Sequence, residues 1–343
     1  MKPATKRPER IAEITDWLRK GKVRPDEAFR LAMELRQRQV ETGSERAARE
    51  RSVREGEAGR AARVAAVLAE LDGLVGLTTV KQHVREIHAY RTIQAKRAAV
   101  GLSHEATGLH MVFTGSPGTG KTTVARLLGR LFKEMGVLSQ GHLVEVERAD
   151  LVGEYIGHTA LKTREVVKRA SGGLLFIDEA YSLARGGEKD FGRESIDCLV
   201  RAMEEQRGDL VIIFAGYSDE MDWFLSQNPG LHSRLPLRIQ FPDYTQEELL
   251  AIAEIMWQKR EYQLSADALL LMRHVLGQPY WGATEGNARA VRNLVERSLR
   301  CQALRLVKQP ECSREQLMQI ERPDLEAALQ AERSPRWWSD PRG

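Results

Sequence analysis

The sequence predicts an α/β protein: a five-stranded parallel sheet between helices, preceded by a helical N-terminal extension and followed by an all-helical C-terminal part. Five short apolar runs alternate with stretches of helical periodicity between residues 109 and 241, which is the pattern of a parallel sheet with crossover helices. A glycine-rich turn separates the first run from the helical pattern behind it. Beyond residues 242–244 only helical periodicity remains.

The N-terminal extension, residues 1–70, is helical in pattern and strongly charged. Apolar residues recur at helical spacing near its start, at Ile11, Ile14, Trp17 and Leu18. Residues 25–27, Pro-Asp-Glu, have the composition of a first helical turn. Between residues 44 and 63 the composition becomes Arg, Glu and Ala. Such stretches are usually solvated helical linkers, and a partner-docking or regulatory arm is the alternative.

The remaining elements are expected in the following order. The predicted strands are 109–113, 142–147, 174–178, 210–215 and 237–241, and a helix over 80–100 precedes the first of them. Thr245, followed by Glu247 and Glu248, is a good N-cap for the first C-terminal helix. Further helices are expected at 265–276, 286–306 and 323–331. These elements divide the chain into an extension (1–70), an α/β domain (71–244), a helical domain (245–331) and a tail (332–343).

Composition argues against several classes of function. The formal net charge of +4 and the pI near 8.9 do not by themselves indicate nucleic-acid binding. The three cysteines, Cys198, Cys301 and Cys312, are isolated and match neither a metal site nor a disulfide framework. There is no apolar run of about 18 residues and no apolar signal-peptide core. We therefore expect a cytoplasmic protein without a membrane span or a zinc site.

The turn after the first predicted strand has the pattern of a phosphate-binding loop. Gly115, Gly120, Lys121 and Thr122 fill G-x-x-x-x-G-K-[ST], between a strand and a helix. The glycines let backbone N–H groups turn toward a phosphate at the helix N-terminus. Lys121 would reach the β- and γ-phosphates, and Thr122 would take one position on Mg²⁺. The predicted nucleotide-binding residues here are Ser116, Pro117, Gly118, Thr119, Gly120, Lys121, Thr122 and Thr123.

A pair of carboxylates follows the third predicted strand. Asp178 and Glu179 come directly after the apolar residues 174–177, at the strand end where open α/β sheets bind ligands. Asp178 would hold Mg²⁺ through water, and Glu179 would orient or deprotonate the attacking water. A strand running into a polar helix cap is the alternative, and the complete phosphate loop earlier in the chain disfavours it. We predict a site for Mg²⁺ and a nucleoside triphosphate.

These motifs together with the helical C-terminal part resemble the AAA+ ATPases. Residues 74–305 resemble the subgroup that contains the rubisco-activase and stage V sporulation protein K types. Two segments in this range, EYIGHTA and GGEKDFG, most resemble the sporulation-protein type. The segments that carry the resemblance are 113–129, 147–160, 174–192, 215–234 and 286–298. The resemblance implies a five-stranded AAA+ module with a helical lid, Mg²⁺-ATP as cofactor, and assembly into a ring, expected to be a homohexamer.

The resemblance also implies roles for residues outside the two motifs. Arg234 would be an arginine finger that reaches the ATP of the neighbouring subunit; a salt bridge that caps a loop is the alternative. Arg289 matches the lid residue called sensor 2; a solvated surface arginine is the alternative. Val75 and Gly76 match the backbone strip that flanks adenine, and simple packing is the alternative.

Two further positions are interpreted on the same basis. The family commonly carries Asn or Thr as sensor 1 at the end of the fourth strand, where this chain has Tyr217 and Ser218, so that assignment stays open. Tyr155 and Ile156, before Gly157, match an aromatic–aliphatic–glycine loop tip that lines the central channel of AAA+ unfoldases; Tyr155 packed in the core is the alternative.

The function predicted from the sequence is ATP hydrolysis coupled to remodelling or threading of a protein partner, in the manner of the sporulation-protein type. A rubisco-activase-type remodeller is the alternative within the family. A nucleic-acid loader or motor is a different class, and it is disfavoured because the sequence has no helix-turn-helix, zinc module or basic patch interleaved with aromatic residues. A nucleotide switch is disfavoured by Glu179 and by the aromatic loop tip. The identity of the protein substrate is not encoded in any recognisable pattern.

Overall fold

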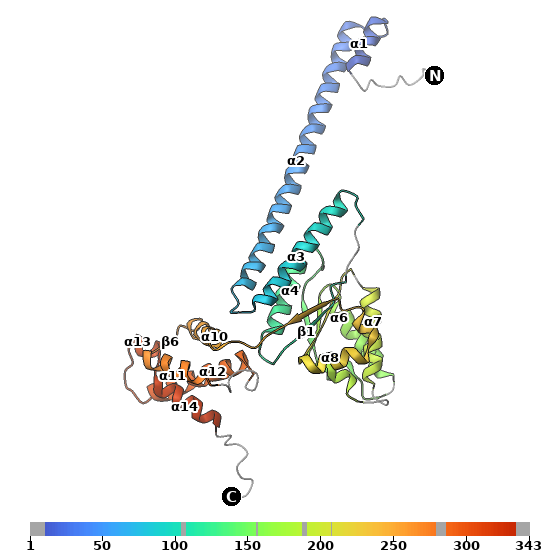
Figure 1. Cartoon of the computed structure of the whole chain (residues 1–343). Coiled ribbons are helices and arrows are strands. Elements are labelled where there is room, and N and C mark those ends of the chain that lie inside the picture. The colour runs from blue at the N-terminus through green and yellow to red at the C-terminus, as the bar shows by residue number, and fades with distance from the viewer. Residues whose placement is uncertain are drawn as a thin grey trace. The chain divides into compact units, whose positions relative to one another are not determined.

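A computed structural model of the chain describes residues 11–103, 108–155, 157–186, 191–206, 208–278 and 286–333. The chain forms two compact units, Met1–Ala65 and Ala66–Gly343. In the first unit, α1 (Ile11–Arg19) is followed by the long helix α2 (Pro25–Asp72) (Figure 1). Ile14 on α1 and Ala28 on α2 are both buried. The stretch rich in Arg, Glu and Ala is part of the same continuous helix α2.

The second unit contains the predicted five-stranded parallel sheet, with strand order β2-β3-β4-β1-β5. The strands are β1 (Met111–Thr114), β2 (Leu143–Val146), β3 (Leu174–Ile177), β4 (Val211–Gly216) and β5 (Leu237–Gln240). β3 and β4 lie inside the sheet and are buried along their whole length, which explains why they read as continuous apolar runs. Because all strands are parallel, the ends of β1, β3 and β4 meet at one edge.

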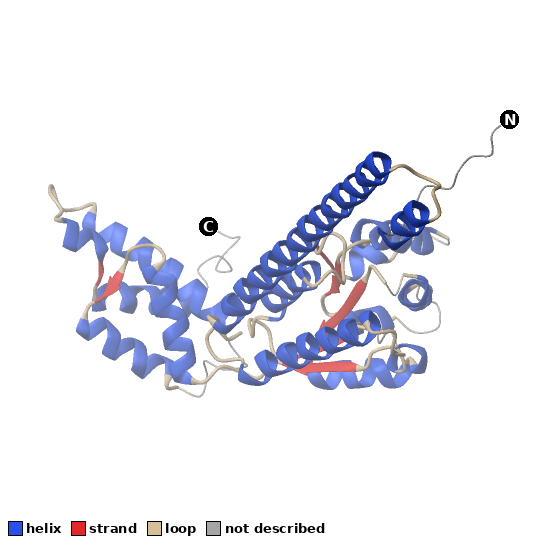
Figure 2. Ribbon diagram, turned by 90° about the horizontal axis from the view of Figure 1, so that it is seen from above, coloured by secondary structure: helices blue, strands red, loops and turns tan. Residues whose placement is uncertain are grey.

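Helices lie on both faces of this sheet (Figure 2). Side chains alternate along each strand, so Val112, Leu175 and Phe214 point to one face and pack there with the residues of α6, α7 and α8. On the other face Phe113 packs against the rings of Phe176 and Phe241. The helices and turns of this part are α3 (Thr78–Ala99), α4 (Lys121–Glu134), α5 (Arg148–Leu151), α6 (His158–Ala170), η1 (Ala180–Ala184), α7 (Gly192–Glu205), α8 (Ser218–Gln227) and α9 (Pro229–His232).

The C-terminal part is helical and has its own apolar core around the buried Trp257, whose Nε1 donates a hydrogen bond to Ser298 Oγ (3.2 Å). Its helices are α10 (Gln246–Gln258), α11 (Ala266–Leu276), α12 (Ala288–Leu306), α13 (Arg314–Met318) and α14 (Arg322–Arg333). The expectation of helices alone was incomplete here, because β6 (Gln263–Leu264) and β7 (Gln319–Ile320) pair as two short parallel strands. Two residues are too few to produce a readable alternation.

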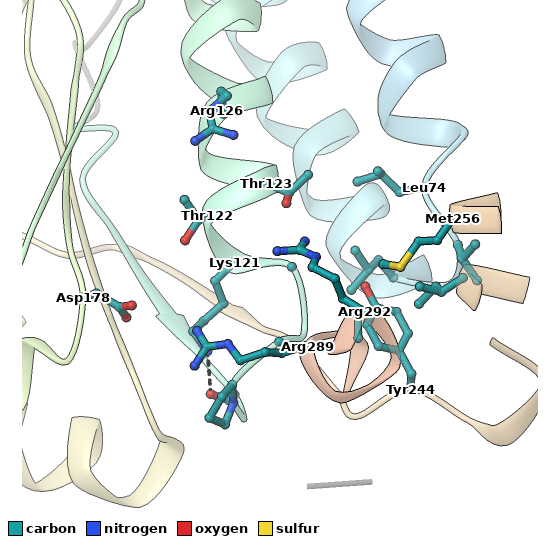
Figure 3. Close-up of a pocket in the computed structure, with 18 of the residues that line it drawn as sticks. Leu74, Lys121, Thr122, Thr123, Arg126, Asp178, Tyr244, Met256, Arg289 and Arg292 are labelled. Atoms are coloured by element: carbon teal, nitrogen blue, oxygen red, sulfur yellow. Dashed lines mark hydrogen bonds between the residues drawn. The ribbon is translucent and has the colours of Figure 1, made fainter. Parts of the chain in front are cut away.

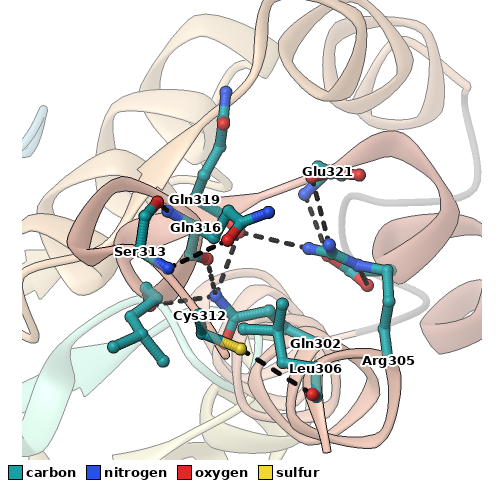
Figure 4. A network of polar contacts seen from close by, with 10 residues as sticks. Gln302, Arg305, Leu306, Cys312, Ser313, Gln316, Gln319 and Glu321 are labelled. Carbon is teal, nitrogen blue, oxygen red and sulfur yellow. Dashed lines mark hydrogen bonds and ion pairs between the residues drawn. The ribbon is translucent and has the colours of Figure 1, made fainter. Parts of the chain in front are cut away.

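Polar side chains of α12 fix the last elements of this part (Figure 4). Gln302 Nε2 lies within 3.2 Å of the carbonyl oxygens of Gln316, Leu317 and Gln319. Arg305 donates to the buried carboxylate of Asp324, and this hydrogen bond raises the pKa of Arg305. Across the described residues, no helix combines the length and apolarity needed to cross a membrane.

Candidate nucleotide-binding site

A cavity of about 590 Å³ opens in the second unit beside the glycine-rich loop after β1. Its walls come from that loop and the start of α4, from the ends of β3 and β4, and from α10 and α12 of the helical part (Figure 3). This is the sheet edge at which parallel α/β folds place ligands. The cavity therefore joins the two sequence motifs to the helical part.

The glycine-rich loop has a backbone that only small residues permit. Gly115, Gly118 and Gly120 have φ values of +145°, +74° and +94°. A Cβ atom at Gly118 would lie 2.0 Å from the carbonyl oxygen of Gly286, at the start of α12. Gly118 is therefore required both by its own conformation and by the close approach of the helical part. Thr119 is wholly buried, and its hydroxyl closes the loop by donating to the Ser116 carbonyl (2.8 Å).

Lys121 begins α4 and turns its ammonium group back over the loop. Its Nζ lies 2.8 Å from the carbonyl oxygen of Gly115 and 2.9 Å from that of Ser116. Burial lowers the pKa of Lys121 below its ordinary value, and the charge of Asp178 opposes that shift. The positive charge of Arg289 lowers this pKa further. Two cations and the N-terminus of α4 thus converge at one end of the cavity, which suits a polyphosphate.

Oxygen ligands suitable for Mg²⁺ lie at the same end. Thr122 and Asp178 both line the cavity, and Asp178 Oδ1 accepts a hydrogen bond from the backbone N–H of Glu179 (3.1 Å). Among the described residues, no cluster of three His, Cys, Asp or Glu side chains is arranged to hold an ion. An ion bound here would complete its shell with phosphate and water oxygens, which Mg²⁺ accepts.

Glu145 is a cavity residue that the sequence did not reveal. It comes from β2, an edge strand, and its Oε1 accepts a hydrogen bond from the Thr122 hydroxyl (3.2 Å). A single acidic residue within a short amphipathic strand has no distinguishing pattern, because a solvent-facing position in a strand is commonly charged.

Glu179 leaves β3 with a left-handed backbone (φ 46°, ψ 44°), which is uncommon for a residue with a side chain. Glu179 lines the cavity and is exposed to solvent. Tyr181 follows Glu179 by two residues and is buried. Burial and the charge of Glu179 raise the pKa of Tyr181 to about 12. Of the two sensor 1 candidates, Tyr217 lines the cavity, whereas Ser218 begins α8.

The opposite end of the cavity is apolar and suits a nucleobase. Its lining residues come from the segment before α3 and from α10, namely Leu74, Val75, Ile252, Ile255 and Met256. Gly76 adjoins this pocket but does not line it: a Cβ atom there would lie 2.2 Å from a carboxylate oxygen of Glu248. Tyr244 donates from its hydroxyl to the carbonyl oxygen of Thr119 (3.2 Å), and burial raises the pKa of Tyr244 to about 12.

Four basic side chains line the cavity in addition to Lys121. Arg289 and Arg292 project from α12, and Arg126 comes from α4 (Figure 3). Lys259 follows α10. Arg289 was expected in the cavity, and the other three were not. Helical spacing is the signal that was available, since Arg126 follows Thr122 by four residues and Arg292 follows Arg289 by three.

Two of the predicted site residues lie away from the cavity. Arg234 follows α9, and its guanidinium bonds the carboxylate of Glu204 on α7. Tyr155 lies in the loop between α5 and α6, where its side chain is 65% exposed and its ring meets that of His158 edge-on at 5.5 Å. Ile156, beside it, lies outside the described residues.

Comparisons with known proteins agree with this architecture. The family model described as "ATPase family associated with various cellular activities (AAA)" matches residues 111–243, and the AAA lid domain model matches residues 245–335. Stage V sporulation protein K of Bacillus subtilis (strain 168) is 54% identical over 255 residues, which span 74% of this chain and 79% of that protein. The chain therefore belongs to the AAA ATPase family. Membership of this family implies ATP hydrolysis, and its members typically use ATP with Mg²⁺ and are often oligomeric.

Within the family, the chain belongs to the group of stage V sporulation protein K, rubisco activase and CbbX. A chloroplastic ribulose bisphosphate carboxylase/oxygenase activase of Cyanidioschyzon merolae is 51% identical over 69% of this chain and 81% of that protein. Protein CbbX of Cereibacter sphaeroides is 49% identical over 68% of this chain and 76% of that protein. A solved Thermotoga maritima RuvB mutant, with a TM-score of 0.50 and 17% identity over 76% of this chain and 71% of that chain, shares the fold alone.

Proposed function

We propose that the cavity binds and hydrolyses Mg²⁺-ATP. Lys121 and the loop N–H groups would hold the β- and γ-phosphates, Thr122 and Asp178 would hold Mg²⁺, and Glu179 would orient the attacking water. Arg289, from the lid, would stabilise charge that develops on the γ-phosphate. The observation that carries this proposal is the convergence of two cations, oxygen ligands and an apolar pocket on one cavity.

Sensor 1, the other nucleotide-binding residues and the domain boundaries are also part of the proposal. Tyr217 is the proposed sensor 1, because it is the candidate that lines the cavity. Other proposed nucleotide-binding residues are Val75, Gly76, Ser116, Pro117, Gly118, Thr119, Gly120 and Thr123. The proposed domains are the extension (1–70), the nucleotide-binding domain (71–244), the lid (245–331) and the tail (332–343).

The proposed enzyme is a ring, and a homohexamer is the proposed assembly. Arg234 supports this, because it does not line the cavity of its own chain, and a finger supplied by a neighbour is a recurring device in phosphoryl transfer. Each active site would then be completed at a subunit boundary.

Remodelling of a protein partner is the proposed use of the ATP energy. Tyr155 supports it, because an aromatic ring that is 65% exposed on a loop can hold an extended polypeptide by apolar contact. Gly157 follows with φ +81°, a conformation that glycine adopts without strain, and a Cβ atom there would meet nothing within 4 Å. Ile156 would add apolar contact with the same polypeptide.

The 54% identity to a protein named for sporulation makes a sporulation-type remodeller the leading proposal. Rubisco activation is the second candidate, because relatives at 51% identity carry that name. A nucleic-acid loader is a third and weaker candidate, since the net charge of +4 gives little basis for a phosphate-backbone interface.

The ATP site is tested by binding of a fluorescent ATP analogue and by phosphate release. Lys121→Ala is expected to abolish binding, because it removes the cation at the phosphate end. Glu179→Gln is expected to bind normally without turnover, since it keeps the shape and loses the carboxylate. Robust hydrolysis by either variant would refute the assignment.

The remodelling proposal is tested with partners captured by Glu179→Gln rings and identified by mass spectrometry. Tyr155→Ala is expected to retain ATP binding, assembly and part of the basal hydrolysis, and to lose unfolding of the captured partner. Tyr90→Ala, at another exposed tyrosine (45% exposed, on α3), is the matched control. Remodelling by Tyr155→Ala at the wild-type rate would rule out threading by this loop.

A further inference from the structure

Asn287 lies where three distant segments of the second unit meet. It precedes α12 and is wholly buried. Its Oδ1 accepts a hydrogen bond from the backbone N–H of Tyr244 (3.0 Å), in the linker between β5 and α10. Its Nδ2 donates to Asp243 Oδ1 (3.0 Å) and, in the phosphate loop, to the carbonyl oxygen of Pro117 (3.4 Å). One amide thus links the loop, the linker and the lid.

The backbone at Asn287 is strained, with φ 52° and ψ −128°. Glycine would adopt this conformation more easily than asparagine. Among the described residues, the other non-glycine residues with positive φ are Leu77, Glu179 and Glu261. Leu77 and Glu179 line the cavity, which agrees with the tendency of backbone strain to collect at functional sites. The side chain of Asn287 is therefore the feature that requires explanation.

Two more contacts join the same segments. The Tyr244 hydroxyl donates to the carbonyl oxygen of Thr119 (3.2 Å), so the linker also holds the far end of the loop. The carbonyl oxygen of Gly286 packs so closely on Gly118 that a Cβ atom would lie 2.0 Å from it. The first turn of α12 consequently rests on the phosphate loop, and Arg289 follows Asn287 by two residues.

We propose that Asn287 is a positioning residue that ties the lid to the phosphate loop and thereby sets Arg289 over the phosphate end of the cavity. The proposal rests on the proposed ATP site. The amide is the right group for this junction, because it accepts from the Tyr244 N–H while donating to Asp243 and Pro117. An aspartate would accept equally well, but it would place a second carboxylate against Asp243. A shift of the loop on binding the γ-phosphate would pass through these bonds to α12.

The test measures the affinity of the chain of 343 residues for fluorescent ATP and ADP analogues with Mg²⁺. Asn287→Gly suits the backbone and removes only the side-chain bonds, so we expect a folded protein with nearly unchanged ADP affinity. Its ATP affinity is expected to fall about tenfold, the effect of losing one or two buried hydrogen bonds. Arg289→Ala should lower the ratio of ATP affinity to ADP affinity by a similar factor. The double variant, Asn287→Gly with Arg289→Ala, should lower this ratio no further than Arg289→Ala alone.

Three controls make the outcome decisive. Glu261→Gly places glycine at another positive-φ position of the lid (φ 62°) and is expected to leave the ratio unchanged. Asn287→Asp should lower the ratio, and combining it with Asp243→Asn should recover part of it by reversing donor and acceptor. The proposal is overturned if Asn287→Gly keeps the wild-type ratio of ATP to ADP affinity. It is also overturned if the decreases in this ratio caused by Asn287→Gly and Arg289→Ala are fully additive in the double variant. If Lys121→Ala still binds ATP, the ATP site itself fails, which is a distinguishable result.

Discussion

Arg234 and Glu204 form an ion pair within one chain. Arg234 Nε lies 3.0 Å from Glu204 Oε1, and Nη2 contacts the same oxygen. Arg234 Nη1 also donates to the carbonyl oxygen of Gly230 (2.8 Å). The two side chains are 29% and 47% exposed, so separating the pair costs little, about 0–1 kcal/mol. In the proposed ring, an arginine held in this way would exchange Glu204 for a phosphate of the ATP bound by the neighbouring subunit.

The first prediction concerns this exchange. Arg234→Ala should bind the ATP analogue and assemble but lose almost all hydrolysis, because arginine fingers in GTPases are worth roughly 10³–10⁵ in rate. Glu204→Gln should retain hydrolysis, since it weakens the ion pair that holds Arg234 at rest and leaves Arg234 itself intact. Mixing Arg234→Ala with Lys121→Ala subunits should restore some turnover. Equal losses in Glu204→Gln and Arg234→Ala, or no rescue in mixed rings that demonstrably form, would contradict a role in trans.

The second prediction concerns Glu145, which accepts the Thr122 hydroxyl hydrogen bond at 3.2 Å. Glu145→Gln keeps an acceptor and removes a negative charge beside the proposed Mg²⁺ position. We expect the Mg²⁺ concentration needed for half-maximal binding of the ATP analogue to rise about fivefold, which corresponds to roughly 1 kcal/mol for one nearby charge in water. Glu165→Gln, on α6, is the control. An unchanged Mg²⁺ midpoint would remove Glu145 from the site.

The third prediction compares two glycines that have the same φ of +74°. A Cβ atom at Gly101 would meet nothing within 4 Å. Gly101→Ala should therefore lower the free energy of unfolding only by the conformational strain, about 1–2 kcal/mol. Gly118→Ala adds a methyl 2.0 Å from the Gly286 oxygen and should also abolish binding of the ATP analogue. Urea unfolding and fluorescence titration measure the two effects. Normal binding by Gly118→Ala would show that the loop and lid need not touch.

The fourth prediction follows from the pKa of Lys121, which burial lowers below the ordinary 10.5. Between the folded and unfolded pKa values the unfolded chain binds more protons, so the free energy of unfolding of the nucleotide-free protein should rise with pH there. Affinity for the ATP analogue should fall over the same range, because the ammonium loses its proton. Lys121→Met should lack the Lys121 contribution to the stability trend. A wild-type affinity that is flat up to pH 10.5 would contradict a lowered pKa.

The sheet and the two motifs can be read from the sequence alone. All five strands were predicted, because β1, β3 and β4 are short apolar runs, β2 and β5 alternate apolar with polar residues, and both patterns are local properties. The glycine-rich loop, Asp178 and Glu179 were found for the same reason, since each motif is contiguous in the chain. The fold class and the family are confirmed, whereas the roles of the site residues remain proposals.

Which residues from different elements share the cavity becomes known only when the chain is folded. Asn287 meets Pro117 across 170 positions of sequence, Tyr244 meets Thr119 across 125, and Thr122 meets Glu145 across 23. Likewise, Glu204 could not be paired with Arg234 in advance, because they belong to separate elements, α7 and the segment after α9. A hydrogen bond depends on distance and direction in space, and one sequence carries neither for groups on different elements.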